Sequence, residues 1–469
     1  MPSTETTAED VTRAAGGFGQ AMRSRNERIA DGKALRETVP RESHAGWKRP
    51  ATSRDPLDIL EESNRGRLPE LVPVRYGRML ASPFTFLRGS AALMASDLAT
   101  TPTSGIRVQA CGDCHLLNFG LFATPERNLI FDINDFDETL PAPWEWDVKR
   151  LAASFVVASR DNELTDEEAK AAAIESVRAY RVSLREFSKM SPLEVWYDRL
   201  DAKTIIDMAP NAKLRKIRRQ LIAKAQKRIA DYLYPKISGE VGGRRRLIDQ
   251  PPVLFHVSEQ NFEANIQEAL ADYRSSLPDE RRVLFDRYCL EDIAIKAVGI
   301  GSVGTYCLVG LFFSAENHPL LLQFKEAGPS VLEPYAGKSR YENHGQRIVT
   351  GQRLMQAASD IFLGWLRGHG GRHFYARQLR DMKLSAPTEG ASAERITLYA
   401  ELCGRSLARA HAKSGDAALI SGYLGKADIF DQAIGDFAVE YADQTERDHA
   451  ALVAASKAGR VKALVEAQP

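Results

Sequence analysis

The sequence predicts an α+β protein with two lobes, a mostly helical large lobe and a small β-rich lobe. Residues 163–235 and 399–455 have the spacing of apolar side chains that is typical of helices. Between them, residues 292–327 are dense in β-branched and aromatic residues interrupted by glycines, which indicates antiparallel strands. Two shorter strand-like segments, 106–110 and 128–133, form a hairpin-like pair on either side of a polar loop.

The composition is that of an ordinary globular protein of 469 residues, which is long enough for two or three lobes with real cores. A net charge of +1 gives no global reason to expect nucleic acid or an acidic membrane as partner. No apolar run approaches the roughly 18 residues of a membrane span. Five cysteines at irregular spacing, and a start without an apolar signal region, predict a protein of the reducing cytoplasm.

The chain is expected to divide into four parts. Residues 1–50 contain few large apolar side chains, which predicts a mobile or loosely docked arm, with room for one helix. Residues 51–285 form the large lobe with the polar loops, and residues 286–390 form the small β-rich lobe. Residues 391–469 are helices that return to the large lobe. A connector at 239–255, with glycines, three arginines and two prolines, separates the first helical part from the rest of the chain.

The most informative segment is CGDCHLLN at 111–118, followed closely by NDFDE at 134–138. Asp113 and Asn118 have the D-x-x-x-x-N spacing of a kinase-type catalytic base and its metal-binding Asn. Asp135 then stands where a second Mg²⁺-binding carboxylate is expected. Phosphoryl transfer needs these residue types, because a carboxylate must accept a hydroxyl proton and oxygen ligands must hold Mg²⁺ against the phosphates.

The same loop also matches a c-type haem attachment pattern, C-x-x-C-H, in Cys111, Cys114 and His115. Haem attachment requires export to an oxidising compartment, for which the N-terminus shows no signal. A redox pair or half of a zinc site are further interpretations, although no second C-x-x-C or H-x-x-x-H supplies the other zinc ligands. The simplest interpretation of both cysteines is that they are small buried thiols.

A second region of interest is the glycine motif G-x-G-x-x-G of Gly299, Gly301 and Gly304. In a dinucleotide-binding fold this motif opens a helix, but here strand-forming residues flank it on both sides, which favours a strand–turn–strand lid over ATP phosphates. A plain glycine hairpin is the alternative. The next strand, 319–327, carries Lys325, which is positioned to hold the α- and β-phosphates.

The lysine in such a site is expected to pair with a Glu on the following helix. Residues 344–358 are the candidate for that helix, and Glu333 and Glu342 are both candidates for the partner. The sequence does not choose between them. Residues 372–385 then alternate like a strand that leads into a hinge.

Three further features have both a structural and a functional interpretation. Arg88, followed by Gly89, is positioned to reach a phosphate or to form a structural salt bridge. The helix at 213–233 is strongly basic on one side, which indicates a solvated face or, less simply, a contact with nucleic acid or membrane. His411, near the apolar face of a helix, is interpreted as a structural histidine.

Taken together, these motifs resemble those of the aminoglycoside phosphotransferase and protein-kinase-like superfamily. There the order is glycine loop, strand Lys, helix, hinge, pre-catalytic helix, catalytic loop and metal site. Here the catalytic loop and metal site come first, and the simplest account is a circular permutation. The matching segments are GIGSVG at 299–304, Lys325, CGRSLARAH at 403–411, GDCHLLN at 112–118 and NDFDE at 134–138.

The resemblance implies a bilobal kinase-like fold and an ATP- and Mg²⁺-dependent phosphotransferase with an unidentified hydroxyl-bearing acceptor. It implies that Asp113 is the base and that Asn118 and Asp135 bind Mg²⁺. Lys325 would hold the α/β-phosphates, and backbone N–H groups of 299–304, Ser302 among them, would cover the β/γ-phosphates. Transfer of AMP instead of phosphate is compatible with the same motifs.

From about residue 50 to 460 the chain also resembles an uncharacterised bacterial family defined only as a domain of unknown function. The shared segments include FLRGSA, GDCHLLNFG, NDFDE, VGIGSVGT, LLQFKEA, GQRLMQAASD, YARQLRDMK, LARAHAKSGD and YADQ. That resemblance implies no substrate. The chain departs from the kinase-like pattern where Cys111 replaces a usual His and where the helix Glu is unassigned. A nucleotide-binding pseudokinase is therefore the alternative function.

Overall fold

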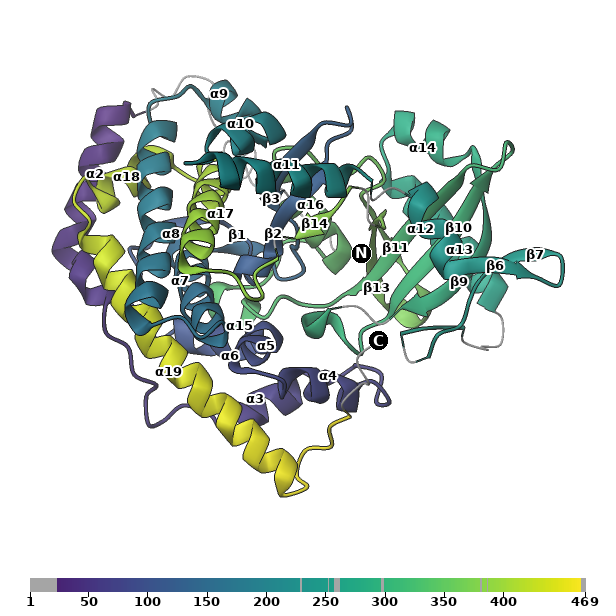
Figure 1. Cartoon of the computed structure of the whole chain (residues 1–469), viewed down its shortest axis with the longest axis horizontal. Coiled ribbons are helices and arrows are strands. Elements are labelled where there is room, and N and C mark those ends of the chain that lie inside the picture. The colour runs from purple at the N-terminus through teal and green to yellow at the C-terminus, as the bar shows by residue number, and fades with distance from the viewer. Residues whose placement is uncertain are drawn as a thin grey trace, which may run out of the picture.

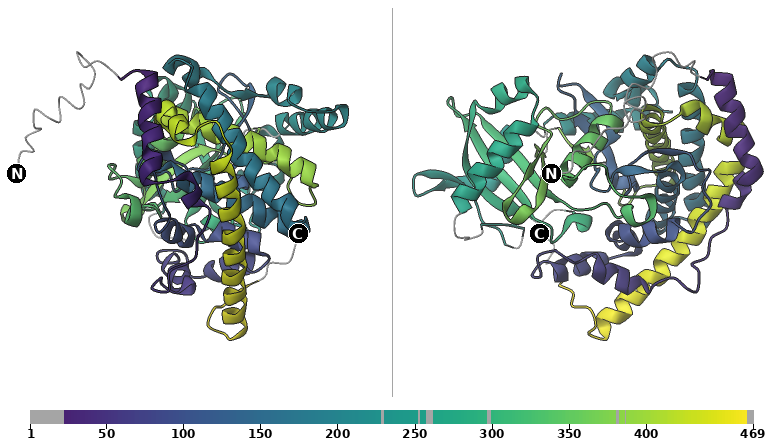
Figure 2. Two further views of the ribbon diagram at one scale, coloured as in Figure 1. Left: turned by 90° about the vertical axis from the view of Figure 1, so that its left-hand side faces the viewer. Right: turned by 180° about the vertical axis from the view of Figure 1, so that it is seen from behind.

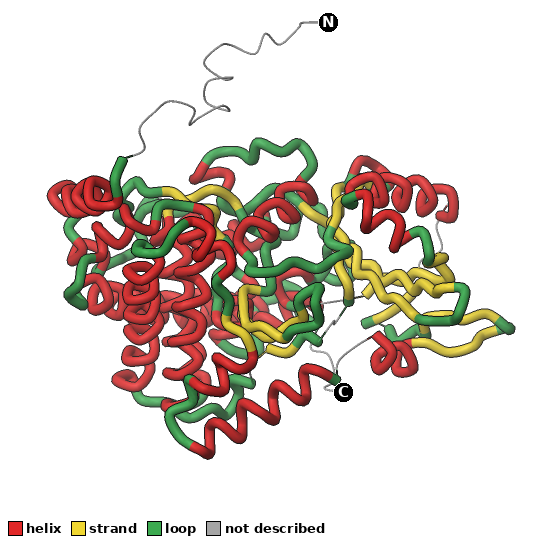
Figure 3. Tube along the Cα trace, turned by 90° about the horizontal axis from the view of Figure 1, so that it is seen from above, coloured by secondary structure: helices red, strands yellow, loops and turns green. Residues whose placement is uncertain are grey.

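The computed structural model describes residues 23–227, 230–251, 253–256, 262–296, 299–379, 382–385 and 387–464. Helices gather on one side of the molecule and a large antiparallel sheet lies on the other (Figure 1; Figure 3), so the predicted α+β class is confirmed. No helix in the part of the chain that the structure describes is long and apolar enough to cross a membrane.

The large lobe is built around α7 (Trp144–Asp161), whose sequence has the apolar spacing of an amphipathic helix. The helix forms, but its residues from Trp144 to Ser159 are all buried, charged ones included. Asp147, Lys149 and Arg150 tolerate this because each has a partner inside the protein. The helices around it are α8 (Asp166–Phe187), α17 (Ala393–Ser414), α18 (Ala417–Leu424) and α19 (Ile429–Lys457).

Two helices of this lobe show how local sequence sets the start of a helix and its buried face. Helix α8 begins at a capping box, in which Thr165 and Glu168 satisfy each other's backbone N–H groups. Helix α11 (Ala212–Gln226) buries Leu214 and Ile222 and leaves most of its basic side chains exposed, as expected for a solvated face. The neighbouring short elements are α9 (Pro192–Tyr197), β5 (Leu200–Asp201) and α10 (Ala202–Asp207).

The described part of the predicted N-terminal arm is docked. Helix α2 (Arg25–Thr38) lies along α18 at one end of the molecule (Figure 1; Figure 2). The backbones approach so closely that a Cβ on Gly32 would lie 2.0 Å from the carbonyl oxygen of Leu419. Nε of Arg36 also donates a 2.8 Å hydrogen bond to the carbonyl oxygen of Tyr423. Residues 1–22 lie outside the described residues.

The small lobe is formed by a six-stranded sheet in the order β12-β13-β11-β10-β9-β8. All of its strand pairs are antiparallel, and Lys325 on β11 stands opposite Cys307 on β10 and Tyr375 on β13. Helix α16 (His344–Met355) follows β11, as the sequence predicts for 344–358. The strands are β8 (Leu254–Phe255), β9 (Tyr288–Lys296), β10 (Cys307–Ser314), β11 (Pro319–Ala327), β12 (Gly364–Arg367) and β13 (His373–Gln378).

Helices α13 (Phe262–Ser276) and α14 (Asp279–Phe285) pack on this sheet, although the sequence places residues up to 285 in the large lobe. Tyr273 lies edge-on to Phe324 and to Phe285, and Phe285 packs on Phe312. These contacts join the helices to the small lobe because the outer face of the sheet needs an apolar cover. The connector 239–255 contains a short hairpin of β6 (Ser238–Val241) and β7 (Arg244–Leu247), preceded by α12 (Ala230–Ile237).

The two strands that flank the polar loop form but do not pair with each other. β1 (Arg107–Ala110) pairs with β4 (Leu140–Pro143), and β3 (Leu129–Ile133) pairs with β2 (Phe119–Ala123). The chain therefore makes two small sheets here instead of one hairpin. β14 (Leu384–Ser385) adds to β2 where the chain returns from the small lobe to α17, and residues 380 and 381 of the predicted strand 372–385 lie outside the described residues.

Four short helices precede the loop and stand beside the glycine segment. They bury Leu60, Met79 and Phe86 in a cluster that also contains Ile300. The N-terminal helices and the glycine segment thus share one core, which the sequence pattern does not reveal. They are α3 (Pro56–Glu62), α4 (Val72–Met79), α5 (Pro83–Gly89) and α6 (Ala91–Leu98).

Candidate functional site

A cleft of about 900 Å³ lies where the polar loops of the large lobe meet the small lobe and the N-terminal helices. The structure brings together in it nearly every residue that the sequence selects. Gly304 is the exception, since it lies just behind the cleft, with its carbonyl oxygen accepting a 2.7 Å hydrogen bond from the N–H of Leu68. The selected residues that line the cleft are Asp113, Asn118, Asp135, Gly299, Gly301, Ser302 and Lys325.

The loop that carries Asp113 is held from below by a buried carboxylate. Asp147, at the start of α7, accepts hydrogen bonds from the backbone N–H of Cys111 at 2.6 Å and of Gly112 at 2.9 Å. Gly112 has a φ of +85°, and a Cβ there would lie 2.4 Å from the carbonyl oxygen of Glu138. Only glycine fits both conditions, so the tight turn before Asp113 is fixed by sequence.

His411 on α17 supports this carboxylate from the other side. Its Nε2 lies 3.2 Å from Oδ2 of Asp147, and its Nδ1 lies 2.8 Å from the hydroxyl oxygen of Tyr180. The imidazole has no exposed surface. His411 is therefore a structural histidine, as the sequence indicates, and it ties the C-terminal helices to the polar loop.

Asp113 is fixed by its own loop and by α7. The side-chain NH2 group of Asn118 donates a 2.6 Å hydrogen bond to the carbonyl oxygen of Asp113, which closes the loop on itself. Nε of Arg150 donates a 2.6 Å hydrogen bond to the Asp113 carboxylate, and Arg150 is also bonded to the carbonyl oxygen of Leu87 at 3.0 Å. Sequence reasoning missed Arg150, whose signal is a cation one turn after Asp147 in an otherwise apolar stretch.

Asp135 faces Lys325 across the cleft, with 3.6 Å between Nζ and Oδ1. This oxygen is buried and has no hydrogen-bond partner. Burial opposes ionisation of Asp135, but the nearby cations Lys325 and Arg377 outweigh it and hold the pKa of this carboxyl well below its usual range. Burial likewise opposes the charge on Lys325, yet the two acidic neighbours Asp135 and Asp137 keep its pKa well above the usual value.

Asp137 is a second residue that sequence reasoning missed. Its carboxylate forms an ion pair with Lys325 and accepts a 2.5 Å hydrogen bond from the hydroxyl group of Tyr375. The hydroxyl group of Ser302 lies 3.3 Å from the same carboxylate. Asp137 thus connects the glycine segment, β11 and β13. The available signal was the second carboxylate of NDFDE, two positions after Asp135.

Neither predicted glutamate is the partner of Lys325. Glu342 lies 3.8 Å from Arg367 with 93% of its side chain exposed, and Glu333 accepts a 3.3 Å hydrogen bond from the N–H of Ser330. The helix after the lysine strand instead presents Arg347 to the backbone of the NDFDE segment. Arg347 donates hydrogen bonds to the carbonyl oxygens of Thr139 at 2.7 Å and of Asp137 at 2.8 Å. These bonds position the Asp137 carboxylate, which forms the ion pair with Lys325.

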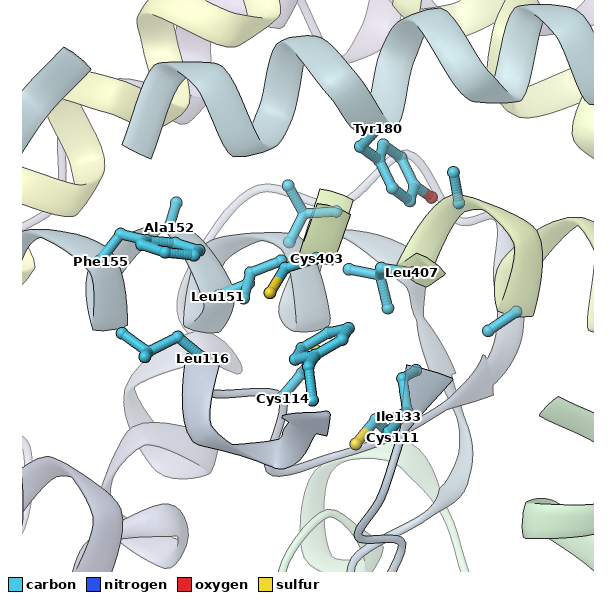
Figure 4. Close-up of a cluster of buried hydrophobic side chains, with 14 of the residues drawn as sticks. Cys111, Cys114, Leu116, Ile133, Leu151, Ala152, Phe155, Tyr180, Cys403 and Leu407 are labelled. Atoms are coloured by element: carbon cyan, nitrogen blue, oxygen red, sulfur yellow. The ribbon is translucent and has the colours of Figure 1, made fainter. Parts of the chain in front are cut away.

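The two cysteines of the loop lie in a buried apolar cluster with Cys403 and Leu407 (Figure 4). Neither Cys111 nor Cys114 has exposed surface, and burial raises the pKa of the Cys114 thiol well above its usual value. This environment is that of small buried thiols. Within the described ranges, no group of three or more His, Cys, Asp or Glu side chains is arranged to hold a metal ion.

The glycine segment is held from outside by the N-terminal helices. It contains a short 3-10 turn, Ile300–Ser302, between β9 and β10. Arg67 donates hydrogen bonds to the carbonyl oxygens of Val303 at 2.6 Å and Gly301 at 2.9 Å. Gly304 has a φ of +88°, and a Cβ there would lie 3.1 Å from Cβ of Arg67. The segment around Arg67 and the glycine segment therefore form one packed unit.

Neither a curated protein nor a solved structure matches the chain. A family model matches residues 67–455, which include the whole cleft apart from its outermost rim at 54–66. That family is described as an uncharacterized protein conserved in bacteria, a domain of unknown function with the designation DUF2252. Because the matched residues make up most of the chain, this chain belongs to that bacterial family.

Proposed function

We propose that this protein is an ATP- and Mg²⁺-dependent phosphotransferase with a circularly permuted kinase-like fold, acting on a hydroxyl-bearing acceptor. The observation that carries the proposal is the convergence of Asp113, Asn118, Asp135 and Lys325 on one cleft. Asp113 and Lys325 come from separate lobes and from segments far apart in sequence. Such a meeting of a D-x-x-x-x-N loop, a second carboxylate and a strand lysine is what phosphoryl transfer requires.

The order of elements in the small lobe supports the same proposal. A glycine turn joins β9 to β10, the lysine stands on β11, and α16 and the β12–β13 pair follow before the chain crosses back at β14. This is the order that the resemblance to kinase-like proteins implies. Helix α17 then brings His411 beneath the catalytic loop, as the pre-catalytic helix of a permuted chain would do.

Asp113 is the proposed base. Its carboxylate lies in the cleft with 21% of the side chain exposed, and Arg150 holds it in one orientation. An acceptor hydroxyl that approaches the Asp113 carboxylate would transfer its proton to it as the hydroxyl oxygen bonds to the γ-phosphorus of ATP. The bond between that phosphorus and the β,γ-bridging oxygen breaks, and ADP leaves. The loop contributes mainly by positioning, because its backbone is fixed by Asp147 and Asn118.

The chain has suitable residues for the metal that this chemistry requires. The NH2 group of Asn118 donates its hydrogen bond to the carbonyl oxygen of Asp113. The amide oxygen is therefore the atom of Asn118 that could bind a metal ion. Asp135 contributes an oxygen that is buried without a hydrogen-bond partner. Mg²⁺ would neutralise the charge of the phosphates. Phosphate and water oxygens would supply the remaining ligands, so such a site would not need three acidic side chains.

Lys325 is proposed to hold the α/β-phosphates. Its ion pair with Asp137 fixes the end of β11 while the ammonium group, which lies 3.6 Å from Asp135, faces the cleft. Backbone N–H groups of 299–304 would lie over the β/γ-phosphates. Ser302 is already bonded to Asp137, so the glycine segment and the lysine are joined through one carboxylate.

The test uses ATP labelled at either the γ- or the α-phosphate, incubated with the protein, Mg²⁺ and a panel of hydroxyl-bearing small molecules and proteins. Transfer of the γ-label, lost in Asp113→Asn, supports the phosphotransferase. Transfer of the α-label instead identifies an AMP-transferring enzyme of the same fold. Retention of both labels on nucleotide, together with nucleotide binding, supports a protein that binds ATP without turning it over.

A nucleotide-binding pseudokinase of that kind is the second candidate function. One observation favours it, namely that both ionisable groups of the proposed reaction already have partners, Asp113 with Arg150 and Lys325 with Asp137. Groups that already form ion pairs within the protein are less available to a substrate. The two functions differ in one measurement, since only the enzyme turns over ATP when the acceptor is present.

A further inference from the structure

One wall of the cleft carries three guanidinium groups that no described carboxylate pairs with. Arg67, Arg75 and Arg88 all line the cleft and all come from the segment before the catalytic loop, Arg67 from the turn between α3 and α4, Arg75 from α4 and Arg88 from α5. Arg67 is bonded to backbone carbonyl oxygens, including that of Ser63 at 3.0 Å. Arg75 is bonded to the side chain of Asn64 and, at 2.6 Å, to the carbonyl oxygen of Gly89.

Arg88 is the least satisfied of the three. Its Nε is buried without a hydrogen-bond partner, and the same is true of Nε of Arg75, whose side chain is only 2% exposed. Burial and the nearby charge of Arg67 lower the pKa of Arg75 to about 9, and burial lowers the pKa of Arg88. Buried cations without a counter-charge cost free energy, so this wall is suited to an anion that supplies the missing charge.

A helix start adds backbone donors to the same wall. Helix α6 is eight residues long and begins after Ser90, which makes no side-chain capping bond to it. Its first residues, Ala91 and Ala92, line the cleft. The free N–H groups and the helix dipole favour negative charge at such a terminus. The three arginines and the start of α6 therefore line the same cleft.

Arg88 brings this wall close to Asp113, while Arg67 lies beside the glycine segment. The Asp113 carboxylate is the nearest acidic influence on Arg88. Arg150, which holds Asp113, is bonded to the carbonyl oxygen of Leu87 in the same helix α5 that carries Arg88. The wall therefore lies where an acceptor would approach the base. A volume of about 900 Å³ is at the upper end of small-molecule sites, which leaves room for a nucleotide and a small acceptor.

We propose that Arg67, Arg75, Arg88 and the start of α6 form a subsite for a phosphate group carried by the acceptor. The acceptor is then a phosphorylated small molecule with a free hydroxyl group. This assignment rests on the proposed phosphotransferase function. The same chemistry would also suit the terminal phosphate of the nucleotide, and nucleotides with and without a γ-phosphate separate these two sources.

The test is calorimetric titration of the full chain with inorganic phosphate. Wild type and Arg65→Gln are expected to bind phosphate alike, because Arg65 is at the cleft rim with 80% of its side chain exposed. Arg88→Gln is expected to bind at least about tenfold more weakly, as loss of a charge-assisted hydrogen bond predicts. Arg88→Lys, which keeps the charge, should retain part of the affinity. Thermal midpoints of all variants show whether each is folded.

Phosphate binding is then measured with saturating ADP–Mg²⁺ and with saturating AMP-PNP–Mg²⁺. The acceptor subsite predicts that phosphate binds in both cases. Exclusion of phosphate by AMP-PNP but not by ADP would assign the wall to the nucleotide's terminal phosphate and overturn the proposal. Equal phosphate affinity in wild type and Arg88→Gln, or no binding to wild type, would also overturn it.

If the proposed phosphotransferase function is wrong, the same experiment gives a different binding result. If neither ADP nor AMP-PNP binds wild type, the nucleotide site fails while Arg88-dependent phosphate binding still identifies the anion subsite. Lys325→Met separates the two sites in the opposite direction, because it should lose nucleotide affinity and keep phosphate affinity. Loss of both in Lys325→Met would mean that there is one shared site, which contradicts a separate acceptor subsite.

Discussion

Nε of Arg150 donates a 2.6 Å hydrogen bond to Oδ1 of Asp113, and the guanidinium that does so is only 1% exposed. The same guanidinium also donates a 3.0 Å hydrogen bond to the carbonyl oxygen of Leu87, so it is held at two points. The orientation of the Asp113 carboxylate is therefore set by α7 as well as by its own loop. This relationship links the core of the large lobe to the proposed chemistry.

Replacement of Asp113 by Asn should remove phosphate transfer while nucleotide binding persists. The amide has the shape of the carboxylate but does not accept the acceptor's proton, and a general base contributes about 10²–10⁴-fold to a rate. We expect turnover to fall within that range and the thermal shift with ADP–Mg²⁺ to remain. Turnover is measured well below the variant's unfolding midpoint. Wild-type turnover in the variant would exclude Asp113 as the base.

Replacement of Asp135 by Ala should remove the effect of Mg²⁺ on nucleotide binding. In wild type, ADP with Mg²⁺ at a hundred times its dissociation constant should stabilise the fold by about 2.7 kcal/mol. The variant lacks the carboxylate oxygen that has no hydrogen-bond partner, so its thermal midpoint with ADP should be the same with and without Mg²⁺. Glu342→Ala, at an exposed position away from Lys325, is the matched control. A metal-dependent shift that survives in Asp135→Ala contradicts the assignment.

Asp147→Ala should destabilise the large lobe by about 2–5 kcal/mol, because two buried N–H groups lose their acceptor. The free energy of unfolding in urea measures the effect. The control is Glu167→Ala, an exposed carboxylate in the first turn of α8, which should change stability by no more than about 0.5 kcal/mol. Similar losses in the two variants would show that Asp147 does not hold the loop.

Glu138 should make stability depend on pH in a predictable direction. Burial outweighs the nearby Arg347 and raises its pKa in the folded protein from the ordinary 4.5 to about 7. The folded state then keeps a proton that the unfolded chain releases, so the contribution to stability is full below about 4.5 and is lost as pH rises to about 7. The slope is at most about 1.4 kcal/mol per pH unit.

Glu138→Gln removes this titration and keeps an oxygen for the 2.7 Å hydrogen bond from the N–H of Val331. Unfolding free energies of the two proteins across this pH range give the contribution by subtraction, since every other group titrates in both. The difference should fall, to the disadvantage of wild type, as pH rises. A difference that is constant with pH would show that Glu138 titrates normally.

The local motifs of the cleft were predictable because each lies within a short stretch of sequence. Asp113 and Asn118 belong to one loop, and the hydrogen bond between them spans only five residues. The glycine turn and Lys325 belong to adjacent strands. Spacing and flanking strand-forming residues are enough to identify features of this kind.

The partners that complete the site were not predictable, because they meet only through the fold. Lys325 and Asp137 are 188 residues apart in sequence, and Arg67 lies 236 residues from Val303. The choice of Asp137 over Glu333 or Glu342 is made by the position of Arg347, which no spacing encodes. For the same reason the pairing of β1 with β4 escaped prediction, although the strand at β1 was evident.

The contact between α2 and α18 affects when the protein can fold during its synthesis. Arg36 and Tyr423 are 387 residues apart, so the first described helix leaves the ribosome long before its partner exists. At a synthesis rate of 5–20 residues per second the wait is roughly 20 to 80 seconds. During that interval the apolar surface that awaits α2 has not been made, and Asp147 lacks His411. The nascent chain therefore completes its large lobe only near the end of translation, and a truncated product would expose unpaired helices to proteases and chaperones.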